Sequence, residues 1–436
     1  MKIGVVADDI TGANDIGSMF AKAGYRVHVY LWDRFDSASL AGEQPDVCII
    51  DTSSRLDAPD VAYGKVAAAT QHLQQAGCRQ FFNKTCSVFR GNIGAEFDAM
   101  LDRLDETFAV VVLGFPKNGR LTIDGVHYVH GQLLEESPFR HDPIHPMTRS
   151  NLVAILQAQT RRAVALVDHR LIAQGADALR GQVAALRGRC HYLILDVPDQ
   201  AALRTIAQAV GEQRVLCGSS ALAEELPAVW GPPAPARQPE ALPSFGSRRV
   251  LGAAGSLTPQ TIAQIDHLRA RGTPLVEVNT VALFDAQERQ AEIAQAVALL
   301  AAHTARGADP LVYAANRPEI VASTRAEGAR AGLLATEVAR VVEETLAEIV
   351  ACTLERTDGR RVVVAGGETS AAICRRLGIG GVRIWQEIQP GLPSCISLTE
   401  RPLLLVLKSG SFGTADFLEL AVDQLTRIEP LPAHDP

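Results

Sequence analysis

The chain has 436 residues, of which 47% are apolar and 21% charged, and its formal net charge is −7. This acidic balance, without an arginine-rich stripe, argues against a nucleic-acid-binding protein, and no apolar stretch approaches the roughly 20 residues of a membrane span. The eight cysteines are scattered without a C-x-x-C pair, which argues against a disulfide framework or a zinc site and predicts reduced thiols in the cytoplasm.

The first half of the chain alternates short apolar runs with helical patterns. Runs typical of buried strands span 3–7, 27–31, 46–50, 79–83, 108–113, 163–167, 192–195 and 214–216. Such alternation predicts a parallel, doubly wound sheet. The segment Phe115–Thr148, rich in Gly, Pro and His, interrupts the pattern, and we expect a hairpin or excursion over the sheet edge there.

The second half repeats the α/β pattern after a break. Trp230–Ser247 holds five prolines and predicts an interdomain linker. Strand-type runs then span 249–253, 274–278, 310–313, 361–365, 381–384 and 403–407. One core rarely grows beyond about 250 to 300 residues, so we expect two α/β domains with largely parallel sheets, 1–229 and 248–436, joined by the linker 230–247. The active site is expected in the cleft between them.

Polar side chains follow three of the first domain's strands. Asp8 and Asp9 end the first strand, and Arg55 follows the third. Lys84, Ser87 and Arg90 follow the fourth. Ligands of open α/β sheets bind at the carboxyl ends of strands, and guanidinium groups grip carboxylates, so these residues predict a pocket for a polyol carboxylate. Helix capping by an acid or by Ser87, and a solvated Arg55, are the structural alternatives.

Four histidines lie in the irregular segment: His127, His130, His141 and His145. Metal ligation by them is disfavoured because Gly and Pro surround them and no helix holds the H-x-x-H pair. We expect pocket lining or loop packing, and no metal site.

Three strand–glycine–helix turns mark the second domain, at Gly255-Ser256, Gly366–Ser370 and Lys408–Gly413. Glycines at such turns free backbone N–H groups to face a phosphate, and the helix dipole adds attraction. One such turn alone is weak evidence, because glycine after a strand often marks only a tight turn. Three of them in one domain predict phosphate binding. None fits the P-loop or the Rossmann fingerprint.

Several blocks together resemble the four-carbon acid sugar kinase family, whose members phosphorylate D-threonate, D-erythronate and related oxo-tetronates with ATP. The similar blocks are ADDITGA, DTSSR, KTCSVFRGNIGAE, GFPKNGR, HPMTRSNL, AGSLTPQT, GGET and KSGSFG. The resemblance implies substrate contacts by Asp9, Arg55, Lys84, Ser87 and Arg90. It implies nucleotide contacts by Ser256, Gly366, Gly367, Glu368, Thr369, Lys408, Ser409, Gly410 and Gly413. The chain departs from the family at Cys86, Val88 and Phe89, where usual members have Asp, Thr and Leu.

The resemblance implies phosphoryl transfer from ATP, with Mg²⁺, to the terminal (4-) hydroxyl of a four-carbon sugar acid. The S-x-x-R-G-N-I-G-A-E frame favours D-threonate, and D-erythronate and 3-oxo-tetronate are the alternatives because Cys86 replaces an Asp. Asp9 is the candidate general base. The expected partners are small molecules rather than nucleic acid or membrane, and a homo-oligomer is left open.

Three other functions fit parts of the sequence. A signalling receiver would use Asp8, Asp9 and Asp51 as its acidic triad, but it needs only about a third of such a chain. A haloacid-dehalogenase-type phosphatase needs D-x-D with both acids on one side of the strand, which adjacent acids do not provide. A non-catalytic sugar-acid and nucleotide sensor would require a defective Lys408 or GGET turn, and both are intact.

Overall fold

The computed structural model describes residues 2–35, 45–142, 144–231 and 242–429. The chain divides into two compact units, Met1–Ala236 and Arg237–Pro436. The central part of the predicted linker, 232–241, lies outside the described residues, and the domain limits 1–229 and 248–436 stay predictions. No described helix is both long and apolar enough to cross a membrane.

The first unit is built on a parallel sheet. Its strands are β1 Ile3–Ala7, β2 Val27–Leu31, β3 Val47–Asp51, β4 Gln80–Lys84, β5 Ala109–Val112, β9 Val164–Val167, β10 Tyr192–Leu195 and β11 Val215–Gly218. They lie in the order β2-β3-β1-β4-β11-β5-β10-β9, each parallel to its neighbours. Every residue of β1 and β3 is buried, as expected for strands covered on both faces. The predicted α/β fold is confirmed.

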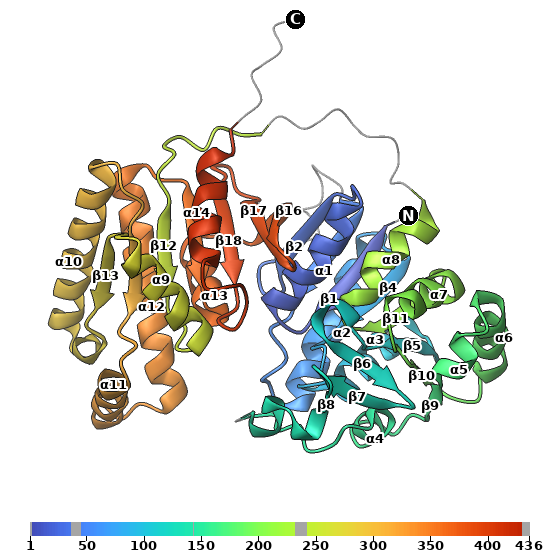
Figure 1. Cartoon of the computed structure of the whole chain (residues 1–436). Helices are drawn as coiled ribbons and strands as arrows, with labels where there is room; N and C mark the ends of the chain where they lie inside the picture. The colour runs from blue at the N-terminus through green and yellow to red at the C-terminus, as the bar shows by residue number, and fades with distance from the viewer. Residues whose placement is uncertain (1, 36–44, 143, 232–241, 430–436) are drawn as a thin grey trace, which may run out of the picture. The chain divides into compact units, whose positions relative to one another are not determined.

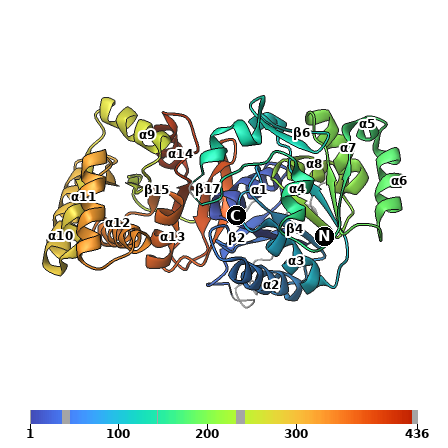
Figure 2. The ribbon, with the colours of Figure 1, turned by 90° about the horizontal axis from the view of Figure 1, so that it is seen from below.

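Helices cover both faces of this sheet. They are α1 Ile10–Lys22, α2 Pro59–Gln75, α3 Ile93–Leu104, α4 Leu152–Gln157, α5 His169–Ile172, α6 Ala176–Leu186, α7 Gln200–Val210 and α8 Ala221–Trp230. α2 packs against α3, whereas α1 and α7 pack against α8. Figure 2 shows α2 and α3 on one face of the sheet and α7 and α8 on the other. The carboxyl edge of the sheet is thereby left to loops.

A small antiparallel sheet interrupts the alternation, as expected. Its strands are β6 Arg120–Ile123, β7 Val126–Val129 and β8 Gln132–Leu133, and the 3₁₀ helices around it are η2 Pro116–Asn118, η3 Leu134–Glu136 and η4 Pro138–His141. Thr122 and Val197 exchange backbone hydrogen bonds of 3.0 and 2.9 Å just beyond the end of β10. The small sheet therefore lies at the carboxyl edge of the parallel sheet (Figure 1).

The second unit has a mixed sheet. Its strands are β12 Leu251–Ala254, β13 Leu275–Val278, β14 Leu311–Ala314, β15 Arg361–Ala365, β16 Gly381–Gln389, β17 Leu392–Ser397 and β18 Leu404–Lys408. The first four and β18 are parallel in the order β13-β14-β12-β15-β18. β17 pairs antiparallel with β18 and with β16. The sequence prediction missed β17 and ended β16 early, because Pro390 and Gly391 in the connecting turn suggested a loop.

The helices of the second unit also lie on two faces. They are α9 Pro259–Ala270, α10 Ala286–Ala305, α11 Pro318–Arg330, α12 Ala335–Thr357, α13 Gly367–Arg376 and α14 Phe417–Arg427, with the 3₁₀ helix η5 Thr280–Phe284. α9 packs against α14, whereas α12 packs against α10, α11 and α13. The strand–glycine–helix turn at Lys408–Gly413 predicts a helix from Thr414. The backbone N–H of Thr414 instead donates to the Gln389 side chain at 3.1 Å, and α14 begins three residues later, at Phe417.

Candidate functional site

Arg55 links the two acids that end β1. Its Nε and Nη2 donate to the carboxylate of Asp8 at 2.8 and 2.7 Å, and its Nη1 donates to Asp9. Asp9 also caps α1 by accepting the backbone N–H of Gly12 at 2.6 Å. Burial acts to raise the pKa of Asp9, but Arg55 and Lys84 outweigh it and hold that pKa below its ordinary value. Asp9 is therefore an anionic capping residue as well as a candidate ligand.

Lys84 ends β4, beside Asp9. Its side chain is buried, and its Nζ donates to the carbonyl of Thr85 at 3.1 Å. A Cβ placed on Gly12 would lie 2.8 Å from this Nζ, so the glycine leaves room for the ammonium group over the first turn of α1. No carboxylate oxygen of the described residues lies within 4.0 Å of it. The ammonium group is therefore available to a ligand.

Cys86 and Arg90 lie on the loop that follows β4, together with the partly exposed Ser87. Arg90 donates to the Cys86 sulfur at 3.4 Å and to Asp142 at 2.7 Å. Burial acts to raise the pKa of the Cys86 thiol, but Arg55 and Arg90 outweigh it and lower that pKa. The Cys86 thiol thus lies among cations, at the position where usual family members have Asp.

Two loops that carry predicted contacts hold strained residues. Ser53, two positions before Arg55, has φ 47°, and Phe89, next to Arg90, has φ 59°. Side chains other than glycine rarely adopt this left-handed conformation, and it persists where the surrounding structure demands it. The surrounding structure therefore holds the backbone of both loops in a fixed conformation.

Two further carboxyl groups lie at this edge. Asp51 accepts the backbone N–H of Ser53 at 2.9 Å, and burial raises its pKa to about 7. Glu96 accepts a hydrogen bond from Ser54 at 2.7 Å, and burial together with Asp8 raises its pKa to about 8. Both belong to the DTSSR and RGNIGAE blocks, so the motifs contained them although neither was singled out as a contact. Asp51 is 1% exposed, which argues against the receiver alternative.

None of the four histidines of the irregular segment belongs to the residue trio whose spacing would suit a metal ion. His127 is buried, its Nδ1 lies 3.1 Å from the Thr122 hydroxyl, and burial lowers its pKa to about 3. That trio, Asp124, His169 and Asp196, has the spacing of metal ligands. The Asp196 carboxylate, however, already accepts backbone N–H groups of Asp124, Gly125 and His169 at 2.7, 2.9 and 3.0 Å. The trio anchors the β6–β7 turn.

The three glycine turns of the second unit converge. A Cβ on Gly255 or on Gly366 would lie 2.3 or 2.6 Å from the Thr369 hydroxyl oxygen. A Cβ on Gly410 would lie 2.0 Å from the hydroxyl oxygen of Ser256. They meet because β12, β15 and β18 are adjacent parallel strands. The residues that the resemblance implies as nucleotide contacts are thus neighbours.

The N-terminus of α13 is suited to an anion. Its N-cap, Gly366, has φ 134° and makes no side-chain cap, so the first N–H groups of the helix, from Gly367 to Thr369, have no intrahelical partner. A Cβ on Gly367 would meet no heavy atom within 4 Å, which leaves the backbone open there. Glu368 is exposed and Thr369 buried. This arrangement fits a phosphate group.

Lys408 is the first residue of the 408–413 loop, and its buried side chain contacts the backbone of that loop. Its Nζ donates to the carbonyls of Ser409 and Gly410 at 3.0 and 3.3 Å and to the Thr261 hydroxyl at 3.2 Å. Burial lowers its pKa to about 7. Gly413 closes the loop with φ 82°. Lys408 therefore shapes the loop, and its charge depends on what the loop binds.

Glu343 of α12 was not predicted. Burial and the neighbouring carboxylate of Glu368 raise its pKa to about 7. It sits within an ordinary helical pattern and had no motif signal. Two acids beside the α13 N-terminus are suited to a hard cation, because such ions prefer carboxylate and phosphate oxygens.

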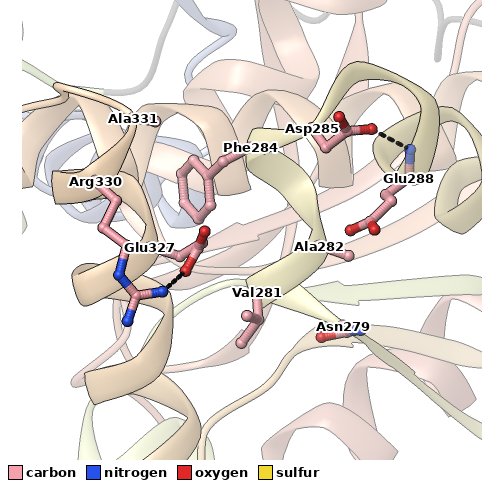
Figure 3. A pocket seen from close by; sticks show the side chains of 9 residues that line it. All are labelled: Asn279, Val281, Ala282, Phe284, Asp285, Glu288, Glu327, Arg330 and Ala331. Carbon is pink, nitrogen blue, oxygen red and sulfur yellow. Dashed lines mark hydrogen bonds and ion pairs between the residues drawn. The ribbon is translucent and has the colours of Figure 1, made fainter.

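A separate cavity of about 440 Å³ lies between η5 and α11. Figure 3 shows Glu327 paired with Arg330, and Asp285 accepting the backbone N–H of Glu288. Glu327 and Arg330 are thus engaged with each other, and Asp285 is engaged in helix capping. None of the described residues that line the cavity is a predicted nucleotide contact. The lining residues are Asn279, Val281, Ala282, Phe284, Asp285, Glu288, Glu327, Arg330 and Ala331.

Two solved structures are similar over nearly their full length. One is a protein from Salmonella typhimurium LT2, provisionally named a tRNA synthase, with a TM-score of 0.82, 30% identity and coverage of 96% of this chain and 98% of that chain. The other is a protein from Haemophilus influenzae, with a TM-score of 0.76, 28% identity and coverage of 97% and 100%. Both share the two-unit fold.

The sequence matches a sugar-binding N-terminal domain over residues 3–226 and a nucleotide-binding C-terminal domain over residues 251–418. A 3-oxo-tetronate kinase from Pseudomonas fluorescens is 37% identical over 97% of both chains. A 3-oxo-tetronate kinase from Cupriavidus necator is 34% identical over 97% of both chains. The chain therefore belongs to the four-carbon acid sugar kinase family.

Proposed function

We propose that the protein transfers the γ-phosphoryl group of ATP to the terminal hydroxyl of a four-carbon sugar acid. As a member of this kinase family, it is a phosphotransferase with an alcohol group as acceptor. The observation that carries the proposal is the meeting of three glycine turns at the uncapped N-terminus of α13. The relatives' names support 3-oxo-tetronate as the acid to test first, and D-threonate, favoured by the sequence block, stays a prediction beside D-erythronate.

The second unit would hold the nucleotide. The first N–H groups of α13 and the 408–413 loop would bind the phosphates, and Ser256 would add a hydroxyl. Lys408 would become charged as phosphate approaches, because an anion offsets the cost of burying its ammonium group. Glu368, with Glu343 beside it, would hold Mg²⁺, which neutralises charge on the transferring phosphoryl group.

The first unit would hold the sugar acid. Among the described residues Lys84 has no acid within ion-pair distance, so it would bind an oxygen of the substrate, and Ser87 would bind a hydroxyl. Asp9, kept anionic by Arg55 and Lys84, would accept the proton of the attacking hydroxyl. Arg55 would fix Asp9, since its guanidinium is already bonded to both acids, and its predicted contact with the substrate stays a prediction. No disulfide joins the eight cysteines, and the cytoplasm stays the predicted compartment.

A coupled assay of ADP release tests the proposal. The purified protein is given MgATP with 3-oxo-tetronate, D-threonate, D-erythronate or an L-form, alongside Lys408→Ala and the surface control Arg401→Ala. We expect turnover with one acid, loss of it in Lys408→Ala and retention in Arg401→Ala, because Arg401 is exposed and pairs with Asp358 on the surface. Absence of turnover on every acid, with ATP still bound, would reject the four-carbon acceptor.

A further inference from the structure

Arg120, the first residue of β6, is a partly buried cation that forms no ion pair with an acid in the part of the chain that the structure describes. Its Nη1 donates to the carbonyl of Asn118 at 2.7 Å, while its Nε is buried without a hydrogen-bond partner. No carboxylate oxygen of the described residues lies within 4.0 Å of its guanidinium. A buried donor and an uncompensated charge are both costly, so a group that satisfies them is to be expected.

Arg120 lies close to a second cation, Arg90. The Phe139 ring lies 5.9 Å from the Arg120 guanidinium and 5.2 Å from that of Arg90, so one aromatic ring faces two cations. Burial and the repulsion from Arg90 outweigh the attraction of Cys86 and Asp15 and lower the pKa of Arg120. Asp15 itself accepts a hydrogen bond from Ser220. The surroundings therefore favour an incoming anion.

The other guanidinium groups at this edge are engaged. Arg55 is bonded to Asp8 and Asp9, and Arg90 to Asp142. Of the cations here, Arg120 and Lys84 lack an acid within ion-pair distance among the described residues. A guanidinium offers two parallel N–H groups that match a carboxylate, whereas an ammonium is a point charge. Arg120 is thus the better carboxylate receptor of the two.

The fold holds Arg120 rigidly. Its backbone exchanges hydrogen bonds with Phe115 at 2.7 and 3.1 Å. The turn that ends its strand is fixed by the Asp196 carboxylate, and Thr122 pairs with Val197 at the end of β10. A receptor group held this way loses little freedom on binding, which favours affinity.

We propose that Arg120 binds the carboxylate of the sugar acid and selects acids over neutral polyols. This inference rests on the proposed function. The anion would satisfy the Nε–H and an Nη–H of Arg120 together, and Lys84 and Asp9 would then face the hydroxylated end of the substrate.

The test is calorimetric titration of the full-length protein with the acid that supports turnover, or with each candidate acid if none does. Arg120→Gln, Arg120→Lys and the matched control Arg140→Gln are compared, since Arg140 is exposed in the same segment. We expect binding about 10- to 100-fold weaker in Arg120→Gln, because hydrogen bonds to charged groups are lost. We expect an intermediate loss in Arg120→Lys, since it keeps the charge without the fork, and none in Arg140→Gln.

A second readout uses the four-carbon tetritols, which lack the carboxylate. Arg120→Gln should bind them as the unmodified protein does and should keep its ATP affinity and melting temperature. Acid binding undiminished in Arg120→Gln, or equal losses for acid and tetritol, would overturn the inference. If the unmodified protein binds an acid but transfers no phosphate, the kinase proposal fails while the titration still decides the role of Arg120.

Discussion

Arg55 and Asp8 share two parallel hydrogen bonds, Nε to Oδ2 at 2.8 Å and Nη2 to Oδ1 at 2.7 Å. The Asp8 side chain is 0% exposed and that of Arg55 is 15% exposed. The pair joins the tip of β1 to the loop after β3. It therefore supports the strand tips from which the acids of this edge project.

Removing Arg55 should destabilise the protein strongly. In Arg55→Met the buried Asp8 carboxylate loses its partner, and we expect the free energy of unfolding to fall by about 3–5 kcal/mol. Urea unfolding followed by circular dichroism measures this change. The double variant Asp8→Leu/Arg55→Met should recover part of the loss, because no lone charge remains at position 8. An unchanged urea midpoint in Arg55→Met would show that the pair is not important for stability.

Glu96 should make stability depend on pH. Its pKa is about 8 in the folded protein against an ordinary 4.5, so between these values the native state keeps a proton that the unfolded chain releases. Stability from this group is full below about pH 4.5 and is lost as pH rises toward 8, by at most about 1.4 kcal/mol per pH unit.

Glu96→Gln is the matched variant, because it cannot ionise and still accepts the bond from Ser54. Urea unfolding of both proteins at pH 5, 6, 7 and 8 should show Glu96→Gln gaining relative stability as pH rises. A constant difference across this range would contradict the raised pKa of Glu96.

Lys408 should couple nucleotide binding to pH. The pKa of Lys408 is about 7 because the side chain is buried, and phosphate binds its charged form. Affinity for MgATP should fall as pH rises above about 7, by up to tenfold per unit. Titration of the protein and of Lys408→Met between pH 6 and 9 measures the effect. The variant should bind weakly with a flatter profile, and parallel profiles would assign the pH dependence to another group.

Gly366 and Gly367 should respond differently to a methyl group. Gly366→Ala meets both φ 134° and the Thr369 hydroxyl at 2.6 Å, so we expect a stability loss of about 1–3 kcal/mol. Gly367→Ala meets nothing and should melt like the parent, but its methyl group would reach into the space proposed for phosphate and weaken ATP binding. Equal melting temperatures for the two variants would contradict the strain at position 366.

The alternation of apolar runs and helical patterns was enough to predict the parallel strands of both units, because buried parallel strands are continuous runs of Val, Ile and Leu. β17 was missed since its neighbouring turn contains Pro390 and Gly391, which resemble a loop when pairing partners are unknown. Thr258 followed by Pro259 predicts the start of a helix, because Pro suits the first helical turn, and Thr258 caps α9 by accepting the N–H of Thr261.

The sequence predicted the candidate site residues at the strand tips, because the carboxyl ends of adjacent parallel strands lie close together. Arg120 lies within the GFPKNGR block but was not named as a contact, and Glu343 lies in none of the blocks. The two were missed for different reasons. Arg120 reaches the edge on an antiparallel excursion, so the order of the parallel strands says nothing of its position. Glu343 belongs to a helical pattern, and its relation to Glu368 arises only when α12 packs against α13.

The small β6–β7–β8 sheet is inserted between β5 and α4, and it is tied to the parallel core by the Thr122–Val197 bridge and the Asp196 carboxylate. Val129 of β7 belongs to the same hydrophobic core as Val6 of β1, so the buried positions of this small sheet are constrained, whereas an exposed position such as Gln132 is free to change. If Arg120 binds the carboxylate as we propose, exposed substitutions around it would tune which acid is accepted, alongside the strand-tip residues Asp9, Lys84 and Ser87. A lineage would then adjust its substrate by local changes at this edge, while the buried positions that carry the fold stay the same.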